Sequence, residues 1–326
     1  MRQMIPTADG VCLAASVYFA QRAEQGVAVF LSATGACRGR YADFALHLAA
    51  LGWNAVTFDY RSIGESFMAT DDVDKASMQA WGERDLDAVI AWAKERFPAQ
   101  RLVLIGHSIG GQIIPLAANH DQVDAVLMVA AQKGHWRLWP APQKYAVWGF
   151  FRLYIPLCLR LFGHVPLRFA GLCSLAPAVA KDYARWTLHL PYRDADGGDL
   201  TSRFANLRAP VLALSFEDDK QYAPRAAVDF LLQRYFLSAP CWRSHIDPKK
   251  LGLKPMGHSG FFERSSCPSC LWAEAAEWLD VAANGGAAQF EFRHLPDVTA
   301  VKEKRPLEDT ERGTTSELQT ALDGSD

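Results

Sequence analysis

The chain has 326 residues, of which 50% are hydrophobic and 21% are charged, and its formal net charge is −2 at pH 7. A chain of this length and apolar content buries one large core, whereas its near-zero charge excludes proteins that hold nucleic acid or another polyanion on an electropositive surface. We therefore expect one soluble globular unit without a nucleic-acid partner.

Apolar runs of strand length alternate with helical segments along most of the chain. An extended pair flanks a turn at Asp9-Gly10, and we predict strands over residues 11–18, 27–31, 55–58, 102–105, 125–129, 211–215 and 242–246. We predict helices over residues 41–51, 81–96, 111–119, 225–235 and 270–282. Such alternation with short links predicts an α/β fold with a mostly parallel central sheet and helices on both faces. Pro115 should bend the third of these helices.

The predicted strand 102–105 ends abruptly in a serine bracketed by glycines, Gly-His-Ser-Ile-Gly-Gly over residues 106–111. A strand that turns sharply into a helix at Ser108 would hold the hydroxyl at the strand end in a strained backbone conformation. A serine that only caps a helix is the plain alternative, but it does not explain the acid and histidine found downstream. The pattern predicts the nucleophile elbow of a serine hydrolase, with Ser108 as the nucleophile.

The base and its carboxylate are expected later in the chain. A serine nucleophile needs a base to take its proton and a carboxylate to hold the tautomer of that base, in the order Ser, Asp or Glu, then His. The buried strand 211–215 leads into the acidic residues 217–219, and His258 lies in a glycine-flanked loop before the last helix. We therefore predict that Asp219 and His258 complete the triad.

Residues 132–193 break the alternation and are dense in aromatic residues and proline. We predict that Trp136, Trp139 and Trp148 line an acyl-binding slot or touch a membrane surface. The plain alternative, of at least equal weight, is a helical cap that packs its aromatic side chains against the sheet. The apolar run 149–162 is too short and too interrupted by arginine and proline to span a bilayer, so no transmembrane segment is predicted.

These patterns divide the chain into three parts. Residues 1–131 and 194–283 form the core, 132–193 form the cap insertion, and 284–326 form a C-terminal tail. From residue 302 onward the tail is polar, acidic and poor in aromatic residues, so we expect the tail to be disordered and dispensable for the chemistry.

The cysteines and the N-terminus bear on the compartment. Seven cysteines, an odd and scattered set, favour reduced thiols over a disulfide framework. Cys267 and Cys270 have metal-ligand spacing, but half a zinc site is weak support for a metal, and none is predicted. The first residues contain no apolar stretch before a small-residue cleavage site. We expect a cytoplasmic protein.

Over residues 4–279 the chain resembles the α/β-hydrolase superfamily, and most closely its serine-aminopeptidase-like and monoglyceride-lipase-like branch. The resemblance is carried by the motifs at residues 38–41, 59–66, 106–111, 215–219 and 257–258. It implies the α/β-hydrolase fold, with the cap over the active site. The acid of the family usually ends a Gly-x-x-Asp turn, and Phe216 replaces that glycine here, which leaves Asp218 as the alternative to Asp219.

The resemblance also implies an oxyanion hole made of two backbone N–H groups. One comes from Ile109, directly after the nucleophile, and the other from the loop after strand 27–31. Members of the family commonly show His-Gly in that loop, where this chain has Ser32-Ala33, and the alignment then makes Thr34 the second donor. A backbone donor requires no particular side chain, so Thr34 remains the candidate.

Together the motifs predict a serine hydrolase that cleaves a small-molecule ester with an apolar or amphipathic acyl group, without a metal or organic cofactor. A peptidase or amidase would use the same triad, but it would ordinarily offer carboxylates in the cap for a free amino terminus. Only Asp182, Asp194 and Asp196 are available there. An acyltransferase would differ in its acceptor alcohol. A catalytically silent binding module is the alternative of another class, and the intact triad disfavours it.

Overall fold

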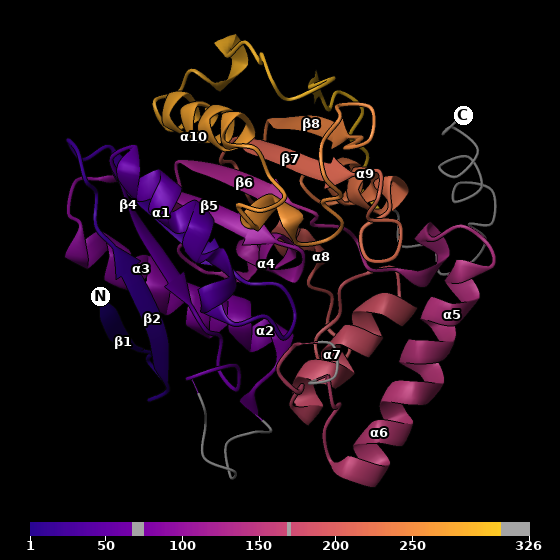
Figure 1. The fold of residues 1–326 in the computed structure, drawn as a ribbon. Coiled ribbons are helices and arrows are strands. Elements are labelled where there is room, and N and C mark those ends of the chain that lie inside the picture. Colours follow the sequence, from indigo (N-terminus) through magenta and orange to yellow (C-terminus); the bar gives the residue numbers. More distant parts are fainter. Residues whose placement is uncertain (67–74, 168–170, 308–326) are drawn as a thin grey trace.

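The computed structural model describes residues 1–66, 75–167 and 171–307 (Figure 1). Within these residues nine strands form one sheet, in the order β1-β2-β4-β3-β5-β6-β7-β8-β9. The strands are β1 (Arg2–Pro6), β2 (Cys12–Tyr18), β3 (Gly26–Leu31), β4 (Trp53–Phe58), β5 (Arg101–His107), β6 (Ala125–Val129), β7 (Val211–Phe216), β8 (Cys241–Ile246) and β9 (Thr299–Ala300).

The middle of the sheet is parallel and its edges are antiparallel. The six strands from β4 to β8 pair in parallel, as expected where helical crossovers join successive strands. At one edge β1 and β2 form a hairpin around Asp9-Gly10, and the Thr7 N–H donates to the Val11 carbonyl at 2.8 Å. β2 then pairs antiparallel with β4, and β9 with β8. The predicted α/β fold with a mostly parallel sheet is confirmed.

Helices cover both faces of the sheet (Figure 1). They are η1 (Arg38–Tyr41), α1 (Ala42–Ala50), α2 (Met78–Ala80), η3 (Trp81–Leu86), α3 (Asp87–Arg96), α4 (Ile109–Gln112), η4 (Ile114–Leu116), η5 (His120–Gln122), η6 (Trp136–Leu138), α5 (Gln143–Gly149), η7 (Phe150–Tyr154), α6 (Ile155–Phe162), α7 (Pro177–Leu188), α8 (Thr201–Phe204), α9 (Arg225–Arg234), η9 (Gly260–Phe262), α10 (Ser269–Ala283) and η10 (Ala287–Gln289). Two of these, η3 and η7, are π-helical turns inside longer helices.

Each face of the sheet has its own apolar core, because side chains alternate between the faces along a strand. In β3, Val27 and Val29 belong to one core, with Leu86 and Ile90 around α3. Ala28 and Phe30 belong to the other core, which α1 and α10 cover. Every residue of β3 is buried. A strand buried on both sides is apolar throughout its length, and such an apolar run in the sequence predicts a strand.

The helix predicted over residues 111–119 is much shorter in the structure. α4 ends at Gln112, and the 3₁₀ turn η4, which contains Pro115, follows it. A proline has no N–H to donate to the preceding turn, but it is tolerated at the start of a helix. Pro115 therefore ends α4 and begins a new turn, rather than only bending one helix.

The cap contains a helix that is longer than the sequence suggested. α5, η7 and α6 run without interruption from Gln143 to Phe162, 20 residues that by length and composition suffice to cross a membrane. The prediction of an apolar run over residues 149–162 that is too short to span a bilayer was therefore wrong on length, because the helix begins at Gln143. Figure 1 shows this long helix as a rod at the margin of the molecule, with α7 beside it.

The C-terminal segment also differs from our prediction of a disordered tail. η10 packs after α10, and β9 extends the sheet at β8. The buried carboxylate of Glu274 accepts hydrogen bonds from the backbone N–H groups of His294, at 2.8 Å, and Leu295, at 2.5 Å. These contacts hold the segment after α10 against the core. Residues 308–326 lie outside the described residues.

Candidate active site

Ser108 occupies the turn between β5 and α4. Its backbone has φ 54° and ψ −120°, a left-handed conformation that is strained for a residue with a side chain. Gly110 lies so close to the end of β3 that any Cβ there would overlap the Leu31 carbonyl. Tight packing of β3 against the turn thus requires the glycine. The predicted sharp strand-to-helix turn is present, and Ser108 lies at the carboxyl end of the central strand.

His258 and Asp219 lie together at the same edge of the sheet. His258 Nδ1 and Asp219 Oδ2 are 2.6 Å apart, and the Asp219 side chain is 1% exposed whereas that of His258 is 17% exposed. Asp219 follows β7, so the parallel register brings its carboxylate to the strand ends. A buried carboxylate on Nδ1 leaves Nε2 of the imidazole as the nitrogen available to a reacting group.

The neighbouring acid has another role in the structure. Asp218 Oδ2 accepts the backbone N–H groups of Met256 at 2.8 Å and Gly257 at 3.0 Å. It therefore braces the loop that carries His258, while Asp219 contacts the ring itself. Of the two acids that the sequence left open, geometry pairs Asp219 with the histidine.

A chain of hydrogen bonds joins the loops of the site through His107. The Ala33 N–H donates to Tyr41 Oη at 2.8 Å, Tyr41 Oη lies 3.0 Å from His107 Nδ1, and His107 Nε2 lies 2.8 Å from the His258 carbonyl. A carbonyl only accepts, so Nε2 carries the proton, Nδ1 accepts from Tyr41, and Tyr41 accepts from Ala33. Burial lowers the pKa of His107 well below its ordinary value, with His258 acting in the same direction, which keeps the ring neutral.

The sequence did not predict this series of hydrogen bonds, although Tyr41 and His107 both lie within motifs described above. Tyr41 ends the motif at residues 38–41, and His107 directly precedes Ser108. Both are fully buried, and their rings pack at 5.8 Å between centroids. They fix the loop after β3, the turn of Ser108 and the loop of His258 relative to one another. They are positioning residues, since their polar atoms are already occupied by the protein.

The two backbone N–H groups predicted to form the oxyanion hole have no hydrogen-bond partner among the described residues. Neither the Thr34 N–H nor the Ile109 N–H donates to another group of the described residues. Ile109 is the first residue of α4, where a backbone N–H has no partner within the helix. The loop of Thr34 is held by the cap, because the Cys173 N–H donates to the Gly35 carbonyl at 2.8 Å.

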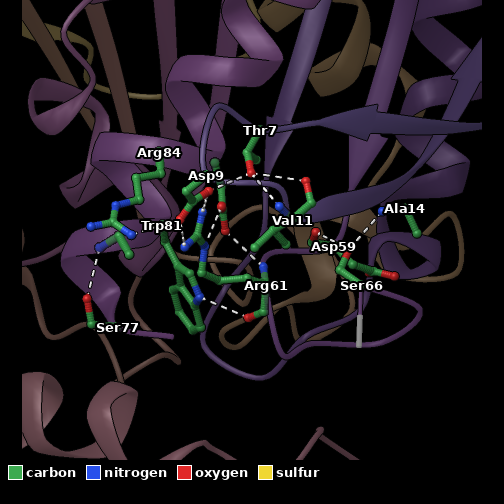
Figure 2. Close-up of polar contacts among 12 residues, drawn as sticks. Thr7, Asp9, Val11, Ala14, Asp59, Arg61, Ser66, Ser77, Trp81 and Arg84 are labelled. Atoms are coloured by element: carbon green, nitrogen blue, oxygen red, sulfur yellow. Dashed lines mark hydrogen bonds and ion pairs between the residues drawn. The ribbon is translucent and has the colours of Figure 1, made fainter. Parts of the chain in front are cut away.

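The motif at residues 59–66 braces the loops rather than supplying chemistry. Asp59 accepts the Arg38 N–H at 2.6 Å and also pairs with the Arg38 guanidinium. Arg38 follows the loop that contains Thr34. Ser66 Oγ donates to the Asp59 carbonyl at 2.6 Å and accepts the Ala14 N–H at 2.8 Å (Figure 2). These bonds tie that loop to β2 and to the end of β4.

Arg61 crosses the same region beneath the hairpin turn. Its fully buried guanidinium donates to Asp9 at 2.8 and 3.0 Å, and its carbonyl accepts from the Trp81 indole at 3.2 Å; Figure 2 shows Arg61 between Asp9 and Trp81. On its other side Arg61 donates to Asp85 at 2.7 Å. The Arg61 guanidinium, as the main cause, holds the pKa of Asp9 far below its usual range. This cluster is an internally paired support for the turn at Asp9-Gly10 and η3.

The three tryptophans proposed for a slot lie in different surroundings. Trp139 is 4% exposed, and its indole N–H donates to the Gln221 carbonyl at 2.9 Å, in the loop after Asp219. Trp136 is half-buried beside the Arg137 guanidinium, and Trp148 is 37% exposed on α5. The structure thus brings Trp139 to the loop that follows Asp219, whereas Trp148 is exposed on α5.

A side chain that sequence reasoning missed lies beside the imidazole. Tyr222 is 52% exposed, and its ring centroid is 5.1 Å from that of His258. Its carbonyl accepts from the Gln132 side chain at 2.8 Å, at the start of the cap. The structure thus leaves an exposed aromatic ring next to His258.

Both ends of the cap are tied to α4, the helix that follows Ser108. Gln112 of α4 donates to Gln132 at 2.7 Å and accepts from the Tyr192 hydroxyl at 2.8 Å. Lys133, fully buried, donates to the Trp186 carbonyl at 2.6 Å and lies 3.9 Å above the Tyr192 ring. Burial lowers the pKa of Lys133 well below its ordinary value. The cap therefore has fixed attachments at both of its ends.

Comparison with known proteins is consistent with this geometry. Residues 28–268 match the Alpha/beta hydrolase family. A stretch of 86 residues is 37% identical to the Probable esterase PIR7A of Oryza sativa subsp. indica, and it covers 26% of this chain and 30% of that protein. The matched part of the chain thus spans about a third of the length of the curated relatives.

Two solved structures are similar over most of the chain. A soluble variant of monoglyceride lipase from Saccharomyces cerevisiae, in complex with a substrate analogue, has a TM-score of 0.57 at 15% identity, and the match covers 86% of this chain and 96% of that one. Proline iminopeptidase from Mycobacterium smegmatis has a TM-score of 0.53 at 16% identity, with 87% and 99% covered. At these identities the similarity shows the fold alone.

Proposed function

The chain belongs to the Alpha/beta hydrolase family, and from that premise we propose that it is a serine hydrolase that cleaves small carboxylic esters with Ser108, His258 and Asp219. The observation that carries the proposal is the 2.6 Å pair of His258 and Asp219, held through His107 next to the strained turn of Ser108. The partial likeness to an esterase supports the ester among acyl substrates.

In the proposed mechanism His258 Nε2 takes the proton of Ser108 as the hydroxyl attacks the substrate carbonyl. The N–H groups of Thr34 and Ile109 stabilise the charge that develops on the carbonyl oxygen, which is worth a few kcal/mol for each donor. His258 then protonates the leaving alcohol, and the same ring activates the water that releases the acyl group from Ser108. The reaction needs no metal or organic cofactor.

The carboxylates of the cap favour an ester over a peptide. Asp182 is 4% exposed and already accepts from Arg185 at 2.6 Å and from the Gln79 N–H at 3.2 Å. Asp194 accepts the backbone N–H groups of Asp196 and Gly198. Two of the three carboxylates that a free amino terminus could use are thus engaged within the protein.

The proposal is tested by covalent labelling. A fluorophosphonate should label the protein, and Ser108→Ala should abolish the labelling, whereas the exposed Ser202→Ala should be labelled like the parent. Undiminished labelling of Ser108→Ala would remove Ser108 from the mechanism, and no labelling of the parent would favour a binding module. A panel of esters, thioesters and peptides, assayed with the parent and Ser108→Ala, then decides the substrate class.

A further inference from the structure

The long helix of the cap exposes an apolar face that packing within the chain does not explain. We define the outer face as Tyr145, Leu153, Leu157 and Leu161, which are 61%, 62%, 53% and 62% exposed. Leu153, Leu157 and Leu161 follow one another at intervals of four residues and therefore lie along one side of the helix, and Tyr145 is exposed two turns before them. Monomeric soluble proteins rarely leave so many large apolar side chains together in water.

The opposite side of the same helix is the one that packs against the protein. Phe151, Ile155 and Cys158 are buried, and the Phe151 ring lies 4.7 Å from that of Tyr183 on α7. The helix is thus apolar on both sides although only one side is covered. Crossing a bilayer would strip the inner side from α7, so the observed packing places the helix along a surface rather than through it.

The charge of this region indicates what lies against the outer face. The sequence has no Asp or Glu between Asp124 and Asp182 but seven Lys and Arg residues, of which Lys133 is buried, in a chain whose net charge is −2. Arg152 and Arg160, both exposed, flank the outer face on the helix itself. A second copy of the chain would bring the same cations to the contact and repel them, whereas an anionic lipid surface complements them.

Aromatic side chains at the margins of the outer face fit the same occupant. Trp148 and Tyr154 are each 37% exposed, and such amphipathic rings favour the boundary between lipid headgroups and acyl chains. Exposed leucines, partly exposed aromatic rings and exposed arginines on one helix form the pattern of a helix that lies in a membrane interface.

We propose that the long helix, residues 143–162, docks the protein on a bilayer surface that contains anionic lipid. The inner side connects this surface to the site, since Phe151 packs on Tyr183 and the Tyr183 phenol lies near the Thr34 hydroxyl. Docking deepens the proposed function and rests on it in one respect: it implies amphipathic esters that partition into membranes as substrates. Binding to the bilayer itself does not depend on Ser108.

The test measures co-sedimentation with vesicles of phosphatidylcholine alone and of phosphatidylcholine with about 30% phosphatidylglycerol. The parent and Ser108→Ala should both bind the anionic vesicles, and more weakly as salt rises. Equal binding of Ser108→Ala without any hydrolysis by the parent would contradict the proposed function and leave docking supported. No binding of the parent to either vesicle would overturn docking.

Matched variants locate the contact. Leu153→Asp combined with Leu157→Asp should weaken partitioning about tenfold or more, since it places charge where apolar contact is made. The control is Leu46→Asp on α1, which is 43% exposed and should bind like the parent. Hydrolysis of a water-soluble short ester should be unchanged in both. Equal loss of binding in both would overturn the assignment, as would a stable dimer that the outer-face variant dissociates.

Discussion

The edge of the sheet that carries the proposed triad and the outer face of the cap are built in opposite ways. At the edge, the polar atoms of Tyr41, His107 and Asp219 have partners within 3.0 Å, in a chain with a fixed direction. On the outer face, Leu153 and Leu157 stay more than half exposed. The polar groups of the first region are paired within the protein, whereas the apolar side chains of the second are left exposed for contact with another surface. Changes at the edge should therefore alter the rate of the chemistry, and changes on the cap should alter which substrates arrive.

The largest effect is expected at Asp219, the acid of the proposed triad. Asp219→Asn should lower kcat by about 10⁴-fold, because an amide N–H in place of the carboxylate would favour the wrong tautomer of His258. Asp218→Asn is the matched control, since that carboxylate accepts only backbone N–H groups of the histidine loop in the described structure. Its loss should be far smaller. Steady-state kinetics on one soluble ester with both variants make the comparison, and the reverse ranking would transfer the role to Asp218.

A smaller loss is expected where the loops are joined. Tyr41→Phe removes the acceptor of the Ala33 N–H and the donor to His107 Nδ1, both buried. Each unmade buried bond costs about 1–3 kcal/mol, so we expect a fall in kcat of about tenfold to a hundredfold and a lower free energy of unfolding. KM should change little, because the displaced groups act on the transition state rather than on the bound ester.

Tyr60→Phe is the control for that substitution. Tyr60 is also fully buried, but its hydroxyl has no hydrogen-bond partner among the described residues. Removing an unpaired buried hydroxyl should leave kcat unchanged and should not destabilise the protein. Both variants are compared by steady-state kinetics and chemical denaturation. Equal losses of kcat and of unfolding free energy in Tyr41→Phe and Tyr60→Phe would contradict a role for the hydrogen bonds of Tyr41.

The parts of the molecule that the sequence predicted are those that depend on neighbouring residues in the chain. Each predicted strand is present with its ends shifted by at most two residues, because a strand buried on both faces is a continuous apolar run such as β6. The contact between Asp219 and His258, at 2.6 Å, was predicted from their order in the chain and from the strand or loop around them, whereas their catalytic roles stay a prediction. These features are local, so a reading along the chain finds them.

What the sequence did not predict depends on contacts between distant segments or on unusual helix geometry. Pro156 suggests a helix break, but the π-helical turn η7 precedes it and shifts the hydrogen-bond register, so the helix continues. β9 has two residues, too few for a pattern. The link from Tyr41 through His107 to the His258 carbonyl joins three loops that meet only in the folded chain.

A third prediction concerns stability and pH at the start of the cap. Burial, with Lys133 adding to it, lowers the pKa of His135 to about 3, and its Nδ1 has no partner among the described residues. Between about pH 6.5 and 3 the unfolded chain then binds a proton that the folded chain does not. Stability therefore falls as pH drops, by about 1.4 kcal/mol per pH unit for this ring. The free energy of unfolding, measured with urea between pH 7 and 5, should fall less steeply in His135→Phe than in the parent, by about 1.4 kcal/mol per pH unit below pH 6.5. An equal fall in both proteins would contradict the low pKa of His135.

The smallest effect per step is expected in acyl-chain selectivity, where the two regions meet. If Trp139, buried beside the loop of Asp219, lines the acyl slot, each methylene that enters it contributes about 0.8 kcal/mol, a threefold to fourfold gain in kcat/KM per carbon. Trp139→Leu should flatten that gain for soluble esters from acetyl to octanoyl. Trp148→Leu should keep it, because Trp148 is exposed on the side of the long helix. Thermal melting confirms that both variants fold. Equal kcat/KM for all these esters in the parent would make the cap a cover without a slot, and flattening by Trp148→Leu alone would move the slot to the long helix.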